Sequence, residues 1–380
     1  MTIQQTLTTD KTECRKAALR LYNHLVSHHI RDDGAIVGPD PGVSLNLRVT
    51  RFIKYYLRAL PWRDQLYYLQ AQAYWIWNNI ELSKLTGDTA CINAALRCAE
   101  VVASRQTDEG WWQYPQAEWK NRVATVEGCF GAVSLLMAFE QSQDQRMLDA
   151  AAKWYNFMVD KIGFQEYDSD SKAINYFSNV GRGLVPNNST LAVWMSALLA
   201  KASGQEKYLE HCPAMVRFLA RCQTSEGELP YVLESDYGPG KLHYLCFQYN
   251  AFQFMDMYEY YLISKSDQAL QVMRGLAEFL SKGLTEQGDA RYDCETNRPT
   301  MHYFTAAVSA ALKCAQDVGL GEYAKIAARG YRRLFDVQKP DGSFGYSVGD
   351  YGFLSDGRSY PRNQGMILRH LLIGASGERQ

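Results

Sequence analysis

The sequence predicts an all-α fold: residues 1–380 form one domain in which twelve helices pair into six hairpins and close into an (α/α)6 toroid. Three observations predict it. A glycine-centred phrase recurs along the chain, short polar breaks lie about half a repeat away from it, and the intervals carry apolar residues at helical spacing. Such helices have to bury their apolar faces against one another, and a closed double ring does this for all of them.

The recurring phrase begins with glutamine or leucine, has a glycine four residues later and ends on a tyrosine. Its copies occupy 106–114, 223–231, 284–292 and 338–346, with a shorter copy at 31–36 and a degenerate one at 163–170. Gly227, Gly288 and Gly342 are 61 and 54 residues apart. The distance from Gly110 to Gly227 is 117 residues, which leaves room for the degenerate copy. The spacing therefore indicates six repeats.

Polar breaks rich in Gly, Ser and Asp separate the predicted helices on the other side of each repeat, and these residue types suit helix-to-helix turns. The breaks lie at 85–88, 141–144, 202–205, 264–267 and 318–321. One set of intervals mixes charges with apolar residues at i, i+3, i+4 and i+7, as amphipathic helices do, and comprises 12–29, 89–105, 145–161, 206–222, 267–282 and 321–337. A less charged set comprises 63–85, 121–140, 187–202, 242–263, 299–316 and 361–374. We expect the charged helices to wrap the apolar ones.

The loops distinguish a closed ring from an open α-solenoid, which also stacks helix pairs. Solenoids usually have short loops on both sides. Here one side carries long loops, at 32–60, 162–186, 228–240 and 339–360. This asymmetry favours a ring with one elaborated mouth.

Composition limits the classes of function. The net charge of −1, from 40 basic and 41 acidic side chains, argues against a general nucleic-acid binder. The nine cysteines include no C-x-x-C pair, the first residues are polar, and no apolar run is long enough to span a bilayer. We therefore expect a soluble, cytoplasmic protein in a reducing compartment. No phosphate-binding or dinucleotide signature is present, and no cofactor is expected.

One copy of the phrase, with Gln106, Gly110 and Trp112, resembles the Q-x-x-x-G-x-W motif of squalene and oxidosqualene cyclases and, more loosely, of protein prenyltransferase β subunits. The copies at 223–231 and 338–346 are weaker, because Leu229 and Phe344 replace the tryptophan. Similar helical toroids serve terpenoid cyclases, glycosidases, sugar epimerases and polysaccharide lyases. The resemblance thus implies an architecture more than a reaction.

The long loops and the N-termini of the inner helices share one face of such a ring, where free N–H groups and helix dipoles favour anions. The catalytic candidates there are Asp64, Glu127, His243, Tyr244, His302 and Tyr303. The substrate-binding candidates are Trp62, Arg63, Tyr67, Trp111, Arg122, Asn187, Asn188, Tyr249, Arg298, Arg362 and Asn363. Each has a structural alternative, as a helix cap, an ion pair or a packed side chain. One concave mouth would receive them all, which favours a site.

The leading hypothesis is an enzyme acting on an acidic, uronate-type glycan or sugar. Arginine and asparagine would neutralise the sugar carboxylate, and a tyrosine or histidine would then move the α-proton. Tyr244 and Tyr303, each next to a histidine, are the candidates for this lyase or C5-epimerase step. Hydrolysis would instead need two carboxylates, for which Asp64 and Glu127 are best placed. No motif decides among these reactions, and the expected partner is an anionic small molecule or glycan.

Two other classes remain open. A terpenoid cyclase is suggested by the repeat, but the segment nearest to a D-x-D-D motif, 168–171, lacks the last aspartate. A non-catalytic glycan-binding toroid would use the same mouth without turnover. No metal is expected, because most histidines lie far apart in sequence and the one pair at i, i+4, His24 and His28, belongs to the first outer helix, away from the expected mouth. If a cation were required, Asp168, Asp170 or Asp236 would be its ligands.

Overall fold

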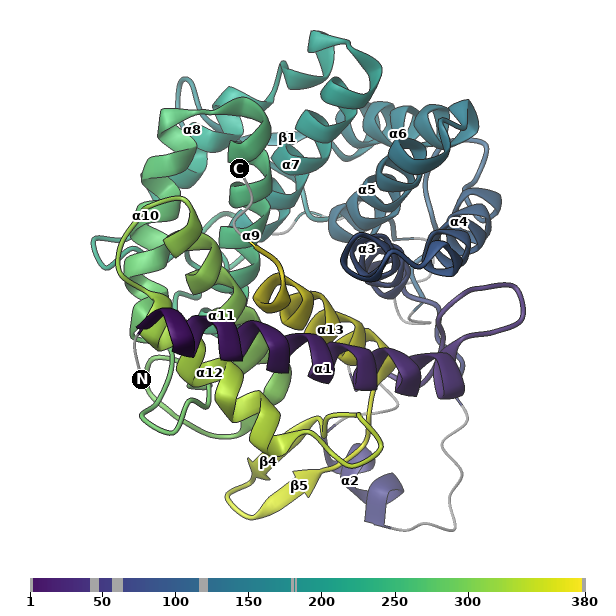
Figure 1. Cartoon of the computed structure of the whole chain (residues 1–380). Helices are drawn as coiled ribbons and strands as arrows, with labels where there is room; N and C mark the ends of the chain where they lie inside the picture. Colours follow the sequence, from purple (N-terminus) through teal and green to yellow (C-terminus); the bar gives the residue numbers. More distant parts are fainter. Residues whose placement is uncertain are drawn as a thin grey trace.

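The computed structural model describes residues 3–41, 48–56, 64–115, 122–178, 181 and 183–377. Helices dominate these residues and alternate between an inner and an outer ring (Figure 1). The inner ring contains α3 (Leu69–Thr86), α5 (Thr125–Ser142), α7 (Pro186–Ser203), α9 (Cys246–Ser264), α11 (His302–Asp317) and α13 (Pro361–Ala375). The outer ring contains α1 (Ile3–His29), α4 (Thr89–Ser104), α6 (Gln145–Phe157), α8 (Cys212–Cys222), α10 (Asp267–Ser281) and α12 (Ala324–Val337). The predicted all-α toroid is confirmed.

Shorter elements complete the chain. A π-helical turn at Met158–Ile162 extends α6, and a 3-10 turn at Glu206–Leu209 precedes α8. Strands β1 (Phe164–Glu166) and β2 (Lys172–Ile174) form an antiparallel pair, and β3 (Thr300–Met301), β4 (Ser347–Asp350) and β5 (Leu354–Asp356) form a small antiparallel sheet. The short helix α2 (Arg48–Tyr56) lies against this sheet, where Arg51 pairs with Asp350 at 2.9 Å and Asp356 at 3.1 Å. These elements stiffen the loops on one side of the ring.

The ring closes on itself. Each inner helix packs against the next, and α13 packs against both α3 and α1, so the last repeat meets the first. A side-chain hydrogen bond seals this joint, because the amide of Gln338 donates to the carbonyl oxygen of Ala17 at 2.9 Å. The open-solenoid alternative is therefore wrong for the described chain.

The glutamine of the recurring phrase fastens one repeat to the next. Gln106 Nε2 donates to the carbonyls of Gly110 at 2.9 Å and Ala150 at 2.8 Å, so that one side chain ties its own loop to the following outer helix. Gln223 makes the same pair of bonds to Gly227 and Val272, and Gln338 to Gly342 and Ala17. We call the segments 106–114, 223–231 and 338–346 the fastening loops.

Glycine is required in these loops for two reasons. Gly110 has a φ of +98°, a region that L side chains rarely adopt, and a Cβ there would lie 2.7 Å from the carbonyl oxygen of Lys153 on α6. Trp112 completes the loop, since its indole N–H donates to the carbonyl of Val102 at 2.9 Å. The motif thus holds an outer helix to the loop that follows.

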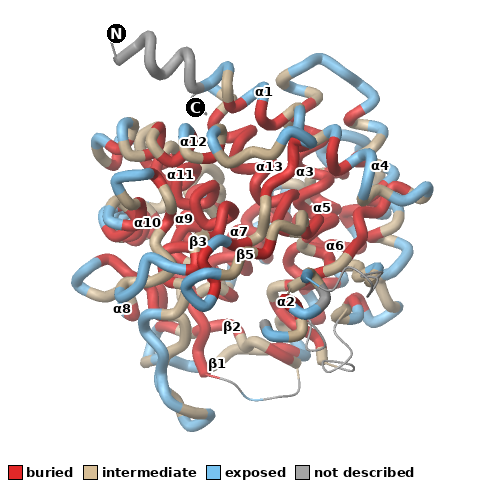
Figure 2. The backbone as a smooth tube through the Cα atoms, turned by 90° about the horizontal axis from the view of Figure 1, so that it is seen from below, coloured by how far each residue is buried: buried red, intermediate tan, exposed pale blue. Residues whose placement is uncertain are grey.

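Burial separates the two rings (Figure 2). Helices α3 and α7 are buried over most of their surface, whereas α6 alternates buried and exposed residues with helical period. The polar breaks between them are helix caps: Asp88, Asp144 and Ser266 each accept a backbone N–H in the first turn of the outer helix that follows. None of the helices in the described residues is long and apolar enough to cross a membrane.

Candidate functional site

The inner helices surround a partly enclosed cavity with a volume of ≈ 190 Å³, which we call the chamber. One buried water needs about 10–15 Å³, so the chamber has room for roughly a dozen waters or one sugar ring. All six inner helices contribute to its wall. The lining side chains include Tyr68, Gln70, Tyr74, Trp77, Tyr114, Glu127, Phe130, Tyr176, Asn187, Leu191, Trp194, Gln248, Tyr249, Phe252, Asp256, Glu259, Tyr303, Arg362, Asn363, Met366, Arg369 and His370.

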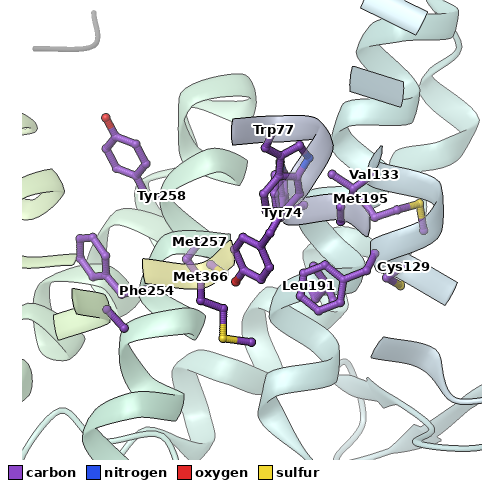
Figure 3. Close-up of a cluster of buried hydrophobic side chains, with 14 of the residues drawn as sticks. Tyr74, Trp77, Cys129, Val133, Leu191, Met195, Phe254, Met257, Tyr258 and Met366 are labelled. Carbon is purple, nitrogen blue, oxygen red and sulfur yellow. The ribbon is translucent and has the colours of Figure 1, made fainter. Parts of the chain in front are cut away.

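Aromatic rings form much of the wall. Trp77 of α3 lies 5.0 Å from Trp194 of α7 and 5.3 Å from Tyr74, measured between ring centroids. Figure 3 shows Tyr74 close to Leu191 of α7 and Met366 of α13 at the centre of the ring. Nearer the mouth, Tyr68 packs edge-on against Tyr114 at 6.0 Å. Flat aromatic surfaces with polar tips suit a ligand that is apolar on its faces and polar at its edge.

Glu127 brings an acid to the chamber from the first turn of α5. One of its carboxylate oxygens accepts the backbone N–H of Leu69, the first residue of α3, which fixes the side chain between two inner helices. Burial raises the pKa of Glu127 to about 7, although the Leu69 N–H and the charge of Arg362 act in the opposite direction. The group can therefore give or take a proton near neutral pH.

Arg362, in the first turn of α13, carries a cation whose charge is already matched. Its guanidinium makes two hydrogen bonds to Asp40, at 2.6 and 2.9 Å, and a third to Gln70 at 2.9 Å. It also lies 4.8 Å from the centroid of the Tyr68 ring. Asp40 is 1% exposed, so the carboxylate of this pair is shielded from water. The N-terminal mouth is therefore less cationic than the sequence suggests.

A second polar group lies deeper along α9 and α13. Thr190 donates a hydrogen bond to Asp256 at 2.9 Å, and burial raises the pKa of that carboxyl well above its usual range. Arg369 pairs with Glu259 at 3.3 Å. His370 is fully buried, neither of its ring nitrogens has a hydrogen-bond partner, and burial lowers its pKa to about 3. A neutral imidazole is thus held at the chamber wall.

This deeper group was not among the predicted site residues, because those lie at the starts of the inner helices. A signal was present: acids and a basic pair interrupt two otherwise apolar helices, at Asp256 and Glu259 in α9 and at Arg369 and His370 in α13. Charged residues are rarely buried in a helix without a partner or a function.

Six of the predicted site residues do meet at the chamber, and they come from five different inner helices. They are Glu127, Asn187, Tyr249, Tyr303, Arg362 and Asn363. The hydroxyl of Tyr303 lies 3.5 Å from the amide oxygen of Gln248, which links α11 to α9 at the wall. The converging N-termini that the repeat predicts are therefore real, although only part of each predicted set faces inward.

Other predicted residues lie outside the chamber. They are Asp64, Tyr67, Trp111, Arg122, Asn188, His243, Tyr244, Arg298 and His302, while Trp62 and Arg63 fall outside the described residues. One cause is that four inner helices begin later than predicted, at Leu69, Thr125, Cys246 and His302 rather than at 63, 121, 242 and 299. Residues before those starts belong to loops, and the exposed Arg298 is one of them.

A second cause is helix geometry, since neighbouring residues point about 100° apart. Tyr303 faces the chamber, and His302 instead packs toward Phe344, with 6.3 Å between ring centroids. Burial lowers the pKa of His302 to about 4, so that it stays neutral at physiological pH. Asn188 is fully buried in the same way, next to the inward-facing Asn187.

The remaining outliers have other partners. Arg105 lies over the ring of Tyr67 at 3.9 Å, Trp111 donates to Glu109 at 3.0 Å, and Arg122 lies 5.7 Å from the ring of Phe177. These contacts involve loops around the ring rather than its centre. Tyr67, Trp111 and Arg122 are therefore not placed to bind a ligand in the chamber.

His243 and Tyr244 lie just ahead of α9. His243 Nδ1 is 2.8 Å from a carboxylate oxygen of Glu228, and Tyr244 packs against Tyr231 at 4.6 Å. Tyr231 in turn contacts the chamber residue Tyr249 at 5.1 Å. Glu228, His243, Tyr244 and Tyr231 thus pack on the side of Tyr249 that faces away from the chamber.

The aspartates considered for cyclase or metal chemistry lie on the outside of the ring. Asp168 and Asp170 both pair with Arg221 of the outer helix α8, and Asp170 also pairs with Arg217 at 3.2 Å. Their partners fix a surface turn between β1 and β2, away from the chamber.

No protein-family model and no curated protein matches this sequence. Solved structures do match its fold. A cellobiose 2-epimerase from Spirochaeta thermophila superposes with a TM-score of 0.72 at 14% identity, over 99% of this chain and 98% of that one. A possible member of the GH105 family from Salmonella enterica gives 0.68 at 12% identity, over 96% and 93%. A family 76 glycoside hydrolase from a bovine Bacteroides thetaiotaomicron strain gives 0.70 at 11% identity, over 96% and 77%.

At these identities the likeness concerns the fold. It bears out the expected resemblance in architecture to toroidal glycosidases and sugar epimerases, over almost the whole of this chain. The chain is thus built on the closed double ring of helices that these carbohydrate enzymes share.

Proposed function

We propose that this protein is an enzyme acting on a carbohydrate, and that the chamber binds the sugar and carries out its chemistry. The observation that carries the proposal is the meeting, in one sugar-sized cavity, of aromatic walls with the buried acid Glu127, whose pKa is about 7. Stacking on Trp77, Trp194 or Tyr68 would hold the apolar faces of a sugar ring. Hydroxyl groups would be bound by the amides of Asn187, Gln248 and Asn363.

Glu127 is the proposed general acid or base. A group whose pKa lies near the working pH is most effective in proton transfer, because both of its protonation states are populated. Asp256 is the second proposed participant, because burial raises the pKa of its carboxyl well above its usual range and so favours the protonated form, which can donate a hydrogen bond. Tyr303, opposite on α11, would orient a substrate hydroxyl toward these groups.

The finer hypothesis of a uronate-type substrate depends on Arg362. Among the described residues that line the chamber, both arginines are paired, Arg362 with Asp40 and Arg369 with Glu259. A sugar carboxylate would have to compete with Asp40 for the guanidinium. The chamber therefore suits a neutral sugar at least as well as an acidic one, and both belong in the test.

The test is a panel of neutral and uronate-bearing mono- and oligosaccharides, incubated with the whole protein in D₂O and in ¹⁸O-labelled water and read by mass spectrometry. Epimerisation introduces deuterium at carbon, hydrolysis introduces ¹⁸O, and a lyase yields an unsaturated product. Glu127→Gln should lower the rate about 10²–10⁴-fold. Glu226→Gln, a surface carboxylate paired with Lys282, is the matched control and should leave the rate unchanged.

Other outcomes would favour the alternatives. Saturable sugar binding without any isotope incorporation or product would identify a binding module. Turnover of an isoprenyl diphosphate added to the same panel, with no sugar turned over, would favour a terpenoid cyclase.

A further inference from the structure

Four potential metal ligands meet behind the chamber wall, where α8 leads to α9. Glu228, His243, Cys246 and Cys294 each offer one ligand atom, and these atoms all lie within 4.8 Å of one another. His243 Nδ1 is 2.8 Å from a Glu228 oxygen, and the two sulfur atoms are 3.3 Å apart.

The acid in the cluster lacks a partner on one side. Glu228 is 1% exposed, and its Oε1 makes no hydrogen bond. A buried carboxylate oxygen left in this state is costly, and such groups are normally paired with a proton donor or a cation. This independent observation indicates that the cluster has a further ligand to accommodate.

We propose that Glu228, His243, Cys246 and Cys294 bind one Zn²⁺ ion. Two thiolates, one imidazole and one carboxylate form a donor set that zinc binds well, with four ligands in a tetrahedron. Around such an ion, ligand atoms are separated by about 3.3–3.8 Å, given bond lengths of about 2.0–2.3 Å. Two of the present separations, 2.8 and 3.3 Å, are slightly too short for such an ion, and the others are no longer than 4.8 Å. Side-chain movements of about an ångström would therefore bring the four atoms to these distances.

The site is structural rather than catalytic, because four protein ligands leave no open coordination position. Its ligands come from three segments. Glu228 belongs to the fastening loop 223–231, His243 and Cys246 bracket the start of α9, and Cys294 lies in the loop after α10. The ion would therefore tie two neighbouring repeats together on the side of the mouth, next to the Tyr231 that supports Tyr249. This inference does not depend on the proposed sugar chemistry.

The spacing of the histidines in the sequence predicts no metal site. The four ligands span 228–294, and only His243 and Cys246 are near neighbours in sequence. Tertiary packing of adjacent repeats brings the other two to them. A search for C-x-x-C or H-x-x-x-H patterns could not find such a site.

The experiment measures zinc in the whole protein, purified under reducing conditions and without chelators, by elemental mass spectrometry. Wild type should carry about one zinc per chain, and Co²⁺ in its place should give the strong visible absorption of tetrahedral thiolate coordination. Cys294→Ala should lose the zinc. His243→Ala should weaken zinc binding, and because this side chain is 39% exposed, the variant should still fold.

Cys91→Ala is the matched control, since it removes one thiol on an outer helix far along the chain and should retain the zinc. The proposal is overturned if reduced wild type takes up no zinc when it is supplied, or if Cys91→Ala loses as much as Cys294→Ala. It is also overturned if the purified chain carries a Cys246–Cys294 disulfide and, once reduced, still binds no metal.

Discussion

The fastening loops and the chamber wall are both assembled from the repeats, yet the repeats contribute to them in opposite ways. In the loops the same residue types recur in the same roles: Gln106, Gln223 and Gln338 each donate to a glycine carbonyl of their own loop and to the next outer helix. At the wall, equivalent helix starts contribute different side chains, such as Glu127, Tyr303 and Arg362. The residues that recur in every fastening loop hold the ring together. The side chains that differ between repeats determine what chemistry the chamber can perform.

The largest effect should come from the wall. Glu127→Gln retains an oxygen that can accept the Leu69 N–H and removes the titrating group. We expect kcat on the sugar substrate to fall about 10²–10⁴-fold, with no decrease in the melting temperature. Steady-state kinetics and thermal melts on the same preparation check this. An unchanged kcat would mean that Glu127 has a structural role only. The side chains that differ between repeats would then not supply the chemistry of the chamber.

The next effect should come from a loop. Gly110→Val places a β-branched residue at a φ of +98° and its Cβ 2.7 Å from the Lys153 carbonyl oxygen, so we expect a loss of about 2–5 kcal/mol in the free energy of unfolding. Gly87→Val is the matched control: its φ is +76°, but nothing lies within 4 Å of the added Cβ. It should cost only about 1–2 kcal/mol. If urea denaturation gives the same loss of unfolding free energy for Gly110→Val and Gly87→Val, close packing against Lys153 is not the reason for glycine at position 110.

Glu127 should also make stability depend on pH. Its pKa is 4.5 in the unfolded chain and about 7 in the folded one, so between these values the folded state holds a proton that the unfolded state has lost. The contribution of this residue to stability is therefore full below about pH 4.5 and is lost as the pH rises to about 7. The loss is at most about 3 kcal/mol.

Denaturation curves of wild type and Glu127→Gln at several pH values between about 5 and 8 test this. The variant should lose part of the slope and become more stable than wild type at the higher values. Parallel curves for the two proteins would show that Glu127 ionises freely in the folded state.

The smallest effect compares two joints of the ring. Gln338→Ala and Gln106→Ala each remove two hydrogen bonds to backbone carbonyls, and each should cost about 1–2 kcal/mol. Gln338 joins the last repeat to the first, whereas Gln106 joins two consecutive ones. Similar losses would mean that the closing joint is as firm as an internal one. A negligible loss for Gln338 alone would mean that the ring opens easily at that point.

The fold was largely predictable, because the repeat is local. The predicted outer helix at 89–105 is α4 (Thr89–Ser104), and the predicted inner helix at 361–374 is α13 (Pro361–Ala375). Amphipathic period, capping aspartates and turn glycines all act within a few residues of sequence. The predictions were weakest where an inner helix follows a long loop, as at α3, since no cap of this kind marks its start.

The site was predictable only in outline. Six equivalent helix starts had to meet around the axis of a closed ring, and residues from all six do line the chamber, although only five of them supply a predicted site residue. Which side chain of each start faces inward could not be read from the sequence. Helices such as α7 are buried almost all round, so that polarity does not distinguish the chamber from the contacts with neighbouring helices.

The sequence by itself determined the helices, their pairing into six repeats and the residues that fasten one repeat to the next, because these features depend on short-range periodicity and on single turns. Only the tertiary structure decided that Asp40 neutralises Arg362, that Asp256 and His370 reach the chamber, and that Glu228 and Cys294 meet the start of α9. These contacts join residues tens to hundreds of positions apart. They follow from the rotation of each helix about its axis and from the closure of the ring, which packing sets for the whole chain at once.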